Sequence, residues 1–147
     1  MTKVITYGTF DLFHIGHLNL LRRLRALGTS LVVGCSSDEF NRIKNKDVVI
    51  PYAERAELLR ACRYVDHVFK EDSWEQKRDD IVRERADIFA MGHDWENKFD
   101  DLSDLCEVIY LPRTEGISTT DIRKKIGARH DLLNRNRSVA RPSVEHF

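Results

Sequence analysis

The sequence is poor in cysteine, proline and methionine, and it has no long apolar run. It holds 3 cysteines, 3 prolines and 2 methionines among 147 residues. An odd number of cysteines without a C-x-x-C pair argues against a disulfide framework and predicts ordinary thiols in a reducing compartment. No apolar run approaches the length that spans a bilayer, and no charged-then-apolar leader opens the chain. We therefore expect a cytoplasmic protein without membrane insertion.

An excess of charge of either sign is absent too. Lys and Arg number 24, and Asp and Glu number 24. This balance lacks the basic field that marks nucleic-acid binders, so no nucleic-acid partner is expected and positive potential must be local.

Short β-rich runs alternate with helical patterns along most of the chain. We expect strands at 4–7, 31–35, 67–69, 88–91 and 108–111, and helices at 18–27, 52–62, 74–85, 99–105 and 119–126. This alternation predicts a Rossmann-like α/β fold: a doubly wound, parallel, five-stranded sheet with helices on both faces. Ligands of such folds gather beyond the carboxyl ends of the strands.

The composition changes near residue 127. From Arg123 to Arg141, basic residues outnumber the single acidic residue, Asp131, and Pro142 argues against a continued helix. We expect residues 128–147 to form a flexible basic tail in solvent, with an interaction arm as the alternative.

Glycine and histidine cluster directly after the first expected strand. Residues 7–17 read Tyr-Gly-Thr-Phe-Asp-Leu-Phe-His-Ile-Gly-His. A strand that turns through glycine into a helix directs free backbone N–H groups and the positive helix end at one spot, which favours a bound anion. The spacing of His14 and His17 places both rings on one side of the first turn, and Gly16 allows close approach of a ligand. The pattern predicts a nucleotide phosphate site.

The histidine pair alone is also compatible with a metal site or with a pair on the surface. Zinc would need further ligands. Asp11 is near, but no Cys/His cluster or His-Glu-x-x-His pattern occurs elsewhere, so the phosphate interpretation is favoured.

A second anion-binding pattern follows the last expected strand. Residues 113–121 read Arg-Thr-Glu-Gly-Ile-Ser-Thr-Thr-Asp and open the final helix. Ser118 or Thr119 can cap that helix, and hydroxyls and free N–H groups there can hold a phosphate. Capping does not account for Arg113, whose planar guanidinium suits bidentate phosphate contact. Two such helix starts at adjacent strand ends predict one polyphosphate held between them.

Together these motifs resemble the cytidylyltransferase family of the HxGH nucleotidyltransferase superfamily. The resemblance rests on His-x-Gly-His after Gly-Thr-Phe-Asp and on Arg-Thr-Glu-Gly-Ile-Ser-Thr-Thr. Tyr-Val-Asp at 64–66, Trp-Glu-Gln-Lys at 74–77 and Met-Gly-His-Asp-Trp-Glu at 91–96 make it similar to members that act on glycerol 3-phosphate. The match covers residues 3 to about 126, so residues 1–127 are the expected catalytic domain.

The resemblance implies transfer of CMP from CTP to glycerol 3-phosphate, which yields CDP-glycerol and pyrophosphate for a teichoic-acid-like or capsular polymer. An alkyl phosphate is already anionic, so it can attack the α-phosphorus in line without a general base or covalent nucleophile. Catalysis is then alignment and neutralisation of charge on the leaving group. Mg²⁺ or another divalent cation would screen the triphosphate, with Asp11 as a candidate ligand, directly or through water. The family resemblance also implies a homodimer.

The resemblance assigns roles residue by residue. The expected catalytic residues are His14, His17, Lys44 and Arg113. The expected nucleotide-binding residues are Gly8, Thr9, Phe10, Gly16, Lys46, Gly92, Asp94, Arg113, Thr114, Gly116, Ile117, Ser118, Thr119 and Thr120. The expected substrate-binding residues are Lys44, Lys77, Arg55 and Arg63, with a dimer contact as the alternative for the two arginines.

Several of these positions have simpler interpretations. Lys44 and Lys46 lie in a polar stretch expected to form a mobile loop over the pocket, although such a run is often merely solvated. Lys77 could be a surface lysine. Asp94 follows a strand end, where a carboxylate can accept the exocyclic amine of cytosine. His93 replaces the acidic residue expected there, which leaves the base pocket and the acceptor open.

Three other functions remain as alternatives: a cytidylyltransferase for another small phospho-alcohol, an adenylyltransferase of the same superfamily, and a non-catalytic nucleotide sensor. The His-x-Gly-His string also resembles class I aminoacyl-tRNA synthetases. However, this chain is too short for their usual domains and lacks their lysine-rich loop.

Replacing His14 or His17 with alanine should lower turnover by about 10²–10³-fold and CTP binding far less, because their donors are expected to act on the transition state. Steady-state kinetics and equilibrium CTP binding on the same variants measure the two effects. Equal loss of turnover and binding would contradict this role.

Overall fold

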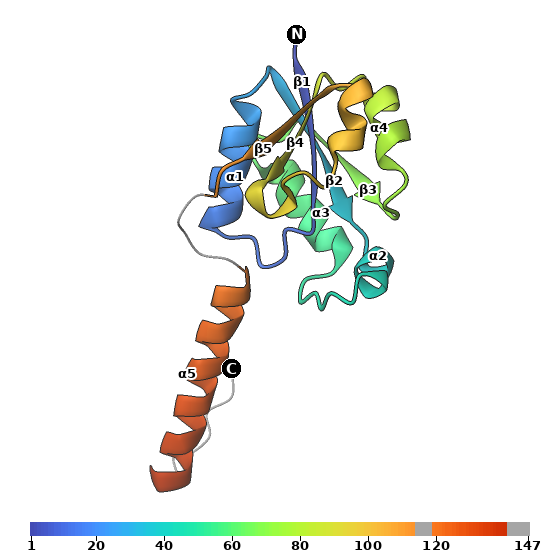
Figure 1. Cartoon of the computed structure of the whole chain (residues 1–147). Helices are drawn as coiled ribbons and strands as arrows, with labels where there is room; N and C mark the ends of the chain where they lie inside the picture. The colour runs from blue at the N-terminus through green and yellow to red at the C-terminus, as the bar shows by residue number, and fades with distance from the viewer. Residues whose placement is uncertain (114–118, 141–147) are drawn as a thin grey trace. The chain divides into compact units, whose positions relative to one another are not determined.

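Five parallel strands form the centre of the larger part of the molecule (Figure 1). A computed structural model describes residues 1–113 and 119–140. The chain divides into two units, Met1–Gly116 and Ile117–Phe147. The first unit contains, in order, β1 (Lys3–Gly8), α1 (Ile15–Arg25), β2 (Ser30–Ser36), α2 (Asp38–Ile43), α3 (Tyr52–Ala61), β3 (His67–Glu71), α4 (Lys77–Glu84), β4 (Ile88–Gly92), the 3-10 helices η1 (His93–Trp95) and η2 (Asp100–Asp104), and β5 (Glu107–Leu111).

The strand order is β3-β2-β1-β4-β5, and every neighbouring pair is parallel. Val4 of β1 stands opposite Leu31 of β2 on one side and Ile88 of β4 on the other. The direction of winding reverses at β1, and in such sheets the ligand crevice opens beyond the carboxyl ends of the strands at the reversal. The predicted doubly wound Rossmann-like fold is confirmed.

Alternate residues of each strand serve two separate cores, since successive side chains point to opposite faces. Val4 packs with Leu24 of α1 and Leu59 of α3, whereas Ile5 packs with Ile81 of α4 and Leu102 of η2. All six are at most 3% exposed. The sheet is therefore held between α1 and α3 on one face and α4 and η2 on the other.

Helix α2 is an element that the sequence did not predict. It begins after Ser37, whose Oγ accepts the Phe40 N–H at 3.1 Å, and Phe40 is buried. Lys44 caps its carboxyl end. The expected mobile loop is thus wrong for residues 42 and 43, which belong to this capped and anchored helix.

Two further boundaries differ from expectation. Helix α4 begins at Lys77, not at residue 74, and the expected helix at 99–105 is only the short η2. Trp74 therefore precedes α4 in an irregular segment, where its ring can turn toward the strand ends.

The second unit contains α5 (Thr119–Ala140), which was expected to end at residue 126. Pro142 lies beyond its end and does not interrupt it, and the Lys, Arg and Leu residues of this stretch are good helix formers. Residues 128–140 are accordingly helical, not an irregular tail; residues 141–147 lie outside the described part.

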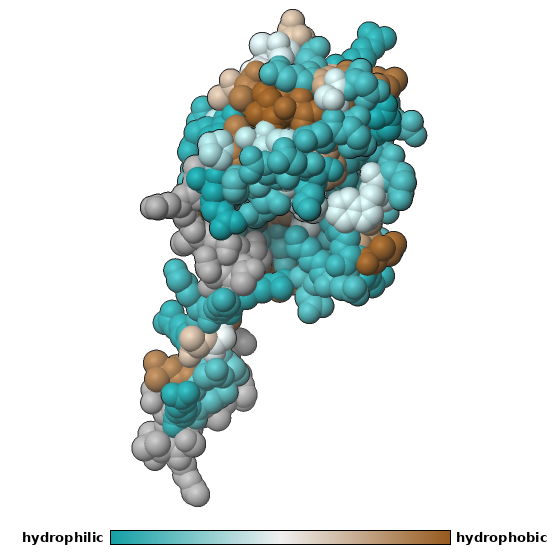
Figure 2. Space-filling model, viewed as in Figure 1, coloured by the Kyte–Doolittle hydropathy of each residue, from teal (hydrophilic) through white to brown (hydrophobic). Residues whose placement is uncertain are grey.

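None of the described helices is long and apolar enough to cross a membrane. Hydrophilic side chains cover most of the face shown in Figure 2. The large exposed apolar residues of the first unit come from separate elements, among them Ile15, Ile43, Leu58 and Val82.

Candidate active site

The turn from β1 into α1 is unusually tight. A Cβ at Gly8 would lie 2.6 Å from the Phe10 ring, so only glycine fits there. Phe10 and Leu12 have positive φ angles of 54° and 52°, a conformation that costs free energy in non-glycine residues and persists only when its surroundings fix it. The Phe10 ring packs into the core, so only the backbone of this residue is available for the nucleotide contact predicted for it.

Asp11 fixes this turn. Its buried carboxylate accepts the N–H groups of Leu12 at 3.1 Å, Val49 at 2.8 Å and Ile50 at 2.9 Å. A carboxylate with its two oxygens directed at three backbone donors does not fit the predicted role of metal ligand. The described residues also contain no group of three or more His, Cys, Asp or Glu side chains that could hold a metal ion.

His14 and His17 form a reciprocal cap at the start of α1. The Gly16 N–H donates to Nδ1 of His14 at 3.1 Å, and the His14 N–H donates to Nδ1 of His17 at 3.3 Å. The two rings stack with centroids 3.8 Å apart. The Gly16 amide, predicted to face the nucleotide, is engaged by this cap.

Both histidines are neutral near pH 7. Burial lowers the pKa of His14, and it lowers the pKa of His17 to about 4, with smaller contributions from the charges of His14 and Lys46. A neutral imidazole whose Nδ1 accepts a hydrogen bond carries its proton on Nε2. Each ring therefore presents an Nε2–H donor of fixed tautomer, which suits contact with phosphate oxygens.

A pocket opens at the carboxyl ends of β1, β2, β3 and β4. It brings together five of the predicted site residues: Gly8, Thr9, Lys44, Lys46 and Lys77. The remaining lining residues are Tyr7, Ser36, Glu71, Trp74, Met91, Trp95 and Phe99. The histidine pair is not part of this lining, but the charge of Lys46 acts on the pKa of His17.

Lys44 lies half-buried on the wall of this pocket. Its Nζ donates to Oγ of Ser36 at 3.1 Å and stands 4.4 Å from the Phe40 ring centroid. Burial lowers the pKa of Lys44 to about 8; Glu71 opposes this effect, and Lys46, Lys77 and Arg55 add to it. The pKa of Lys44 thus lies only slightly above neutral pH, so the amine is still mostly charged there. A half-buried cation of this kind suits contact with an anionic ligand.

Glu71 is the centre of a buried polar network on the floor of the pocket. Its Oε1 accepts the Ser36 hydroxyl at 2.8 Å, and its Oε2 lies 2.6 Å from Nζ of Lys77. Glu71 and Lys77 are both 3% exposed. Lys77 is therefore a buried partner of an acid, not the surface lysine that its sequence context allowed.

Ser36 and Glu71 line the pocket but were not predicted as site residues. They end β2 and β3, one and two residues beyond the expected strand ends, and so lie at the edge where ligands bind. Longer strand predictions would have placed both there, because polar residues at the carboxyl ends of parallel strands are ligand candidates.

Gly92 ends β4, Asp94 lies in η1 directly after it, and Arg113 follows β5. A Cβ at Gly92 would meet no atom within 4 Å, so the space outside this strand end is open. Nη2 of Arg113 is hydrogen-bonded to Oδ1 of Asp94, and both side chains are exposed. The structure thus pairs the residue expected to read the base with one expected to bind phosphate.

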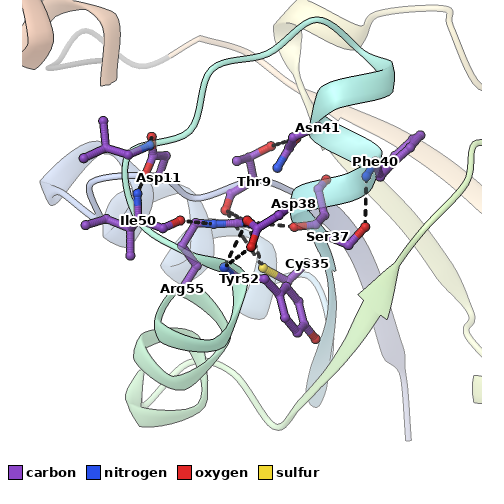
Figure 3. Close-up of polar contacts among 12 residues, drawn as sticks. Thr9, Asp11, Cys35, Ser37, Asp38, Phe40, Asn41, Ile50, Tyr52 and Arg55 are labelled. Atoms are coloured by element: carbon purple, nitrogen blue, oxygen red, sulfur yellow. Dashed lines mark hydrogen bonds and ion pairs between the residues drawn. The ribbon is translucent and has the colours of Figure 1, made fainter.

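Arg55 has a role other than the predicted contact with substrate. Its guanidinium is 1% exposed and lies at the centre of Figure 3. It donates to the carbonyl oxygens of Thr9 at 2.9 Å, Ser36 at 2.8 Å and Ile50 at 2.8 Å, and to Asp38 at 2.8 Å. These bonds tie the ends of β1 and β2 to α2 and to the loop before α3, so Arg55 positions the site from behind.

Arg63 lies at the amino ends of the strands, on the side of the sheet away from the pocket. It is exposed between the end of α3 and the start of β3, and its guanidinium lies 5.5 Å from the Tyr64 ring centroid. The pocket lies beyond the other ends of the strands, so the predicted substrate contact of Arg63 is wrong within this chain. The nearby Asp66 accepts the Leu31 N–H at 2.8 Å and thus has a structural role at this end of the strands.

The rest of the second anion-binding pattern cannot be placed. Thr114, Gly116, Ile117 and Ser118 lie outside the described residues. Thr119 and Thr120 open α5, and the description covers only their backbone.

Comparison with known proteins identifies the family. The cytidylyltransferase-like family matches residues 5–125. The chain belongs to this family. Among the curated relatives of this cytidylyltransferase-like chain, the glycerol-3-phosphate cytidylyltransferase of Bacillus subtilis is 57% identical over 126 residues, which cover 86% of this chain and 98% of the relative. The Staphylococcus aureus protein of the same name is 55% identical, and the match covers 86% of this chain and 96% of the relative.

A solved structure supports the fold of this cytidylyltransferase-like chain. The lipopolysaccharide core biosynthesis protein of Thermoplasma volcanium superposes with a TM-score of 0.68 at 22% identity, over 78% of this chain and 99% of that one. At this identity the likeness concerns the fold alone.

Replacing Arg55 with methionine should lower the free energy of unfolding by about 3–5 kcal/mol, because Asp38 and three carbonyl groups lose a buried partner. The same replacement at the exposed Arg63 should change it by less than about 0.5 kcal/mol. Urea unfolding of the two variants makes the comparison. Similar losses at both positions would contradict the roles described here.

Proposed function

We propose that this chain transfers CMP from CTP to glycerol 3-phosphate and releases CDP-glycerol and pyrophosphate. The two bacterial relatives that match it over nearly their whole length carry the corresponding name. The structural observation that carries the proposal is the pocket, in which Lys44 and Lys46 lie beyond the strand end that leads into the histidine turn. This is the arrangement required to hold two phosphate-bearing substrates side by side.

The chemistry follows from these placements. Lys44 and Lys46 neutralise phosphate charge and align an oxygen of the acceptor phosphate with the α-phosphorus of CTP. The Nε2–H groups of His14 and His17 donate to phosphate oxygens as negative charge moves onto the departing pyrophosphate. Arg113, once it exchanges Asp94 for phosphate, adds a bidentate donor. No side chain has to accept a proton, which agrees with the lowered pKa values of both histidines, since these make the rings weak bases.

A divalent cation such as Mg²⁺ is proposed to arrive with CTP, where it would screen the triphosphate charge. Asp11 does not fit as its ligand because the carboxylate already accepts three backbone N–H groups. We further propose a cytoplasmic location, which suits the three free cysteines, and a homodimer, for which molar mass in solution is the check.

The test is a panel of pyrophosphate-release assays. CTP with glycerol 3-phosphate should give release and a product of the mass of CDP-glycerol, whereas ATP should give at least about tenfold less because the base site prefers cytosine. Faster release with ATP would favour an adenylyltransferase. Absence of release with CTP and every phospho-alcohol in the panel would favour a nucleotide sensor.

The pKa of Lys44 predicts a basic limb in the pH profile. Below its pKa of about 8 the amine is charged, and above it the charge is lost as pH rises. We expect kcat/KM for glycerol 3-phosphate to fall up to about tenfold per unit above this pH, because the acceptor loses its cation. The variant Lys44→Arg stays charged, so its basic limb should move to higher pH. An unchanged limb in this variant would assign the titration to another group.

A further inference from the structure

One cation of the pocket is enclosed by aromatic rings. Nζ of Lys77 lies 4.6 Å from the ring centroid of Tyr7, 4.9 Å from that of Trp74 and 5.3 Å from that of Phe99. The same Nζ lies 2.6 Å from Oε2 of Glu71. The three rings belong to the strand before the histidine turn and to the segments before α4 and before η2, so the fold assembles this enclosure from distant parts of the sequence.

Aromatic rings around a cation, with a carboxylate beside them, are the arrangement by which proteins bind alkylammonium ligands. In this chain a lysine fills it. We propose that Lys77 is a specificity-determining residue, which occupies the cation position of the acceptor site and thereby admits phospho-alcohols with a neutral polyol head while excluding those with a cationic amino head. The inference rests on the proposed function, since it concerns the acceptor of that reaction.

The charges of the pocket support this assignment. Its charged lining residues are Lys44, Lys46, Lys77 and Glu71. Glu71 is the one acid among them, and Lys77 already neutralises it. A cationic head group would therefore find no unpaired carboxylate and would meet the ammonium of Lys77, and the like-charge repulsion would disfavour its binding. Lys44 and Lys46 remain to bind the phosphate group.

A neutral polyol meets a different environment. The Lys77–Glu71 pair has no net charge, yet it offers ammonium N–H donors and carboxylate lone pairs close together. Adjacent hydroxyl groups of the polyol can donate to the carboxylate and accept from the ammonium. These hydrogen bonds replace the ones to water that the hydroxyl groups lose on binding. A head group without hydroxyls would leave these buried groups unsatisfied, and such a mismatch gives strong discrimination. Lys77 thus recognises the alcohol head, which makes the substrate contact predicted for it more specific.

The first experiment uses the wild-type chain, so its outcome does not depend on whether a variant folds. Phosphocholine and 3,3-dimethylbutyl phosphate have nearly the same shape, but only phosphocholine carries a cationic head. As inhibitors competing with glycerol 3-phosphate, the neutral compound should bind at least about tenfold more tightly if Lys77 excludes the cation by charge. Equal or tighter binding of phosphocholine would overturn the proposal.

The second experiment changes the enclosed cation. Lys77→Met keeps the unbranched shape but leaves Glu71 and the three rings to an external cation. The ratio of kcat/KM for phosphocholine to that for glycerol 3-phosphate should rise at least about tenfold. In Lys77→Arg, which keeps the charge, the ratio should stay near the wild-type value even if overall activity falls.

Lys70→Met is the matched control. Nζ of Lys70 also lies over an aromatic ring, 4.9 Å from the Tyr52 centroid, but this lysine does not line the pocket. Its replacement should leave both acceptors unaffected. A folded Lys77→Met variant that binds CTP and shows no change in the ratio contradicts the proposal; if this variant does not fold, the wild-type inhibitor comparison decides.

The proposed function and this inference fail in different ways. If the wild-type chain releases no pyrophosphate from CTP and glycerol 3-phosphate, the proposed function is wrong. If it does so, and phosphocholine competes as well as its neutral counterpart, only the role of Lys77 is wrong.

Discussion

The arrangement of the site depends on one buried guanidinium. The Arg55 side chain reaches from α3 to the carboxyl ends of β1 and β2 and to the first turn of α2, and it satisfies carbonyl oxygens that would otherwise be buried without partners. The two strand ends carry Gly8, Thr9 and Ser36 of the pocket lining, and Lys44 stands at the carboxyl end of α2. Separate segments thus acquire a common geometry because a single planar group with several fixed donors connects them.

The pocket that we propose to bind phosphate also contains an acid, Glu71. Glu71 would repel phosphate if it stood alone, but its oxygens accept from Ser36 and Lys77. The acid holds one cation inward, while Lys44 and Lys46 remain on the wall. The pocket therefore holds a neutral Lys77–Glu71 pair in its buried part, while two further lysines, Lys44 and Lys46, line its sides.

Sequence reasoning recovered the fold because the strands are apolar runs with clear helical patterns between them. It also recovered the turn with His14 and His17, since a strand that leads through glycine into a helix is a local pattern. It did not recover α2, whose formation depends on a serine cap and one buried ring, or the full length of α5.

Side-chain roles that depend on tertiary partners were not recoverable in the same way. Nothing in the local sequence distinguishes Arg55 from Arg63. Arg55 is nevertheless enclosed by carbonyl oxygens, whereas Arg63 is exposed at the amino ends of the strands. Asp11 was likewise predicted as a candidate metal ligand, because the residues beside it indicated a phosphate site. In the structure its carboxylate accepts backbone N–H groups from a loop far along the chain. Such roles follow from long-range contacts, which spacing along the chain does not encode.

The reciprocal cap of α1 has a consequence for how the protein responds to its surroundings. Because each imidazole accepts a backbone N–H through Nδ1, protonating either ring would break a hydrogen bond that starts the helix. Protonation of either ring and this reciprocal cap are mutually exclusive, so the lowered pKa values keep the histidine half of the site in one state through modest swings of pH. The lysine half, with an amine that titrates near pH 8, is where such swings would be felt.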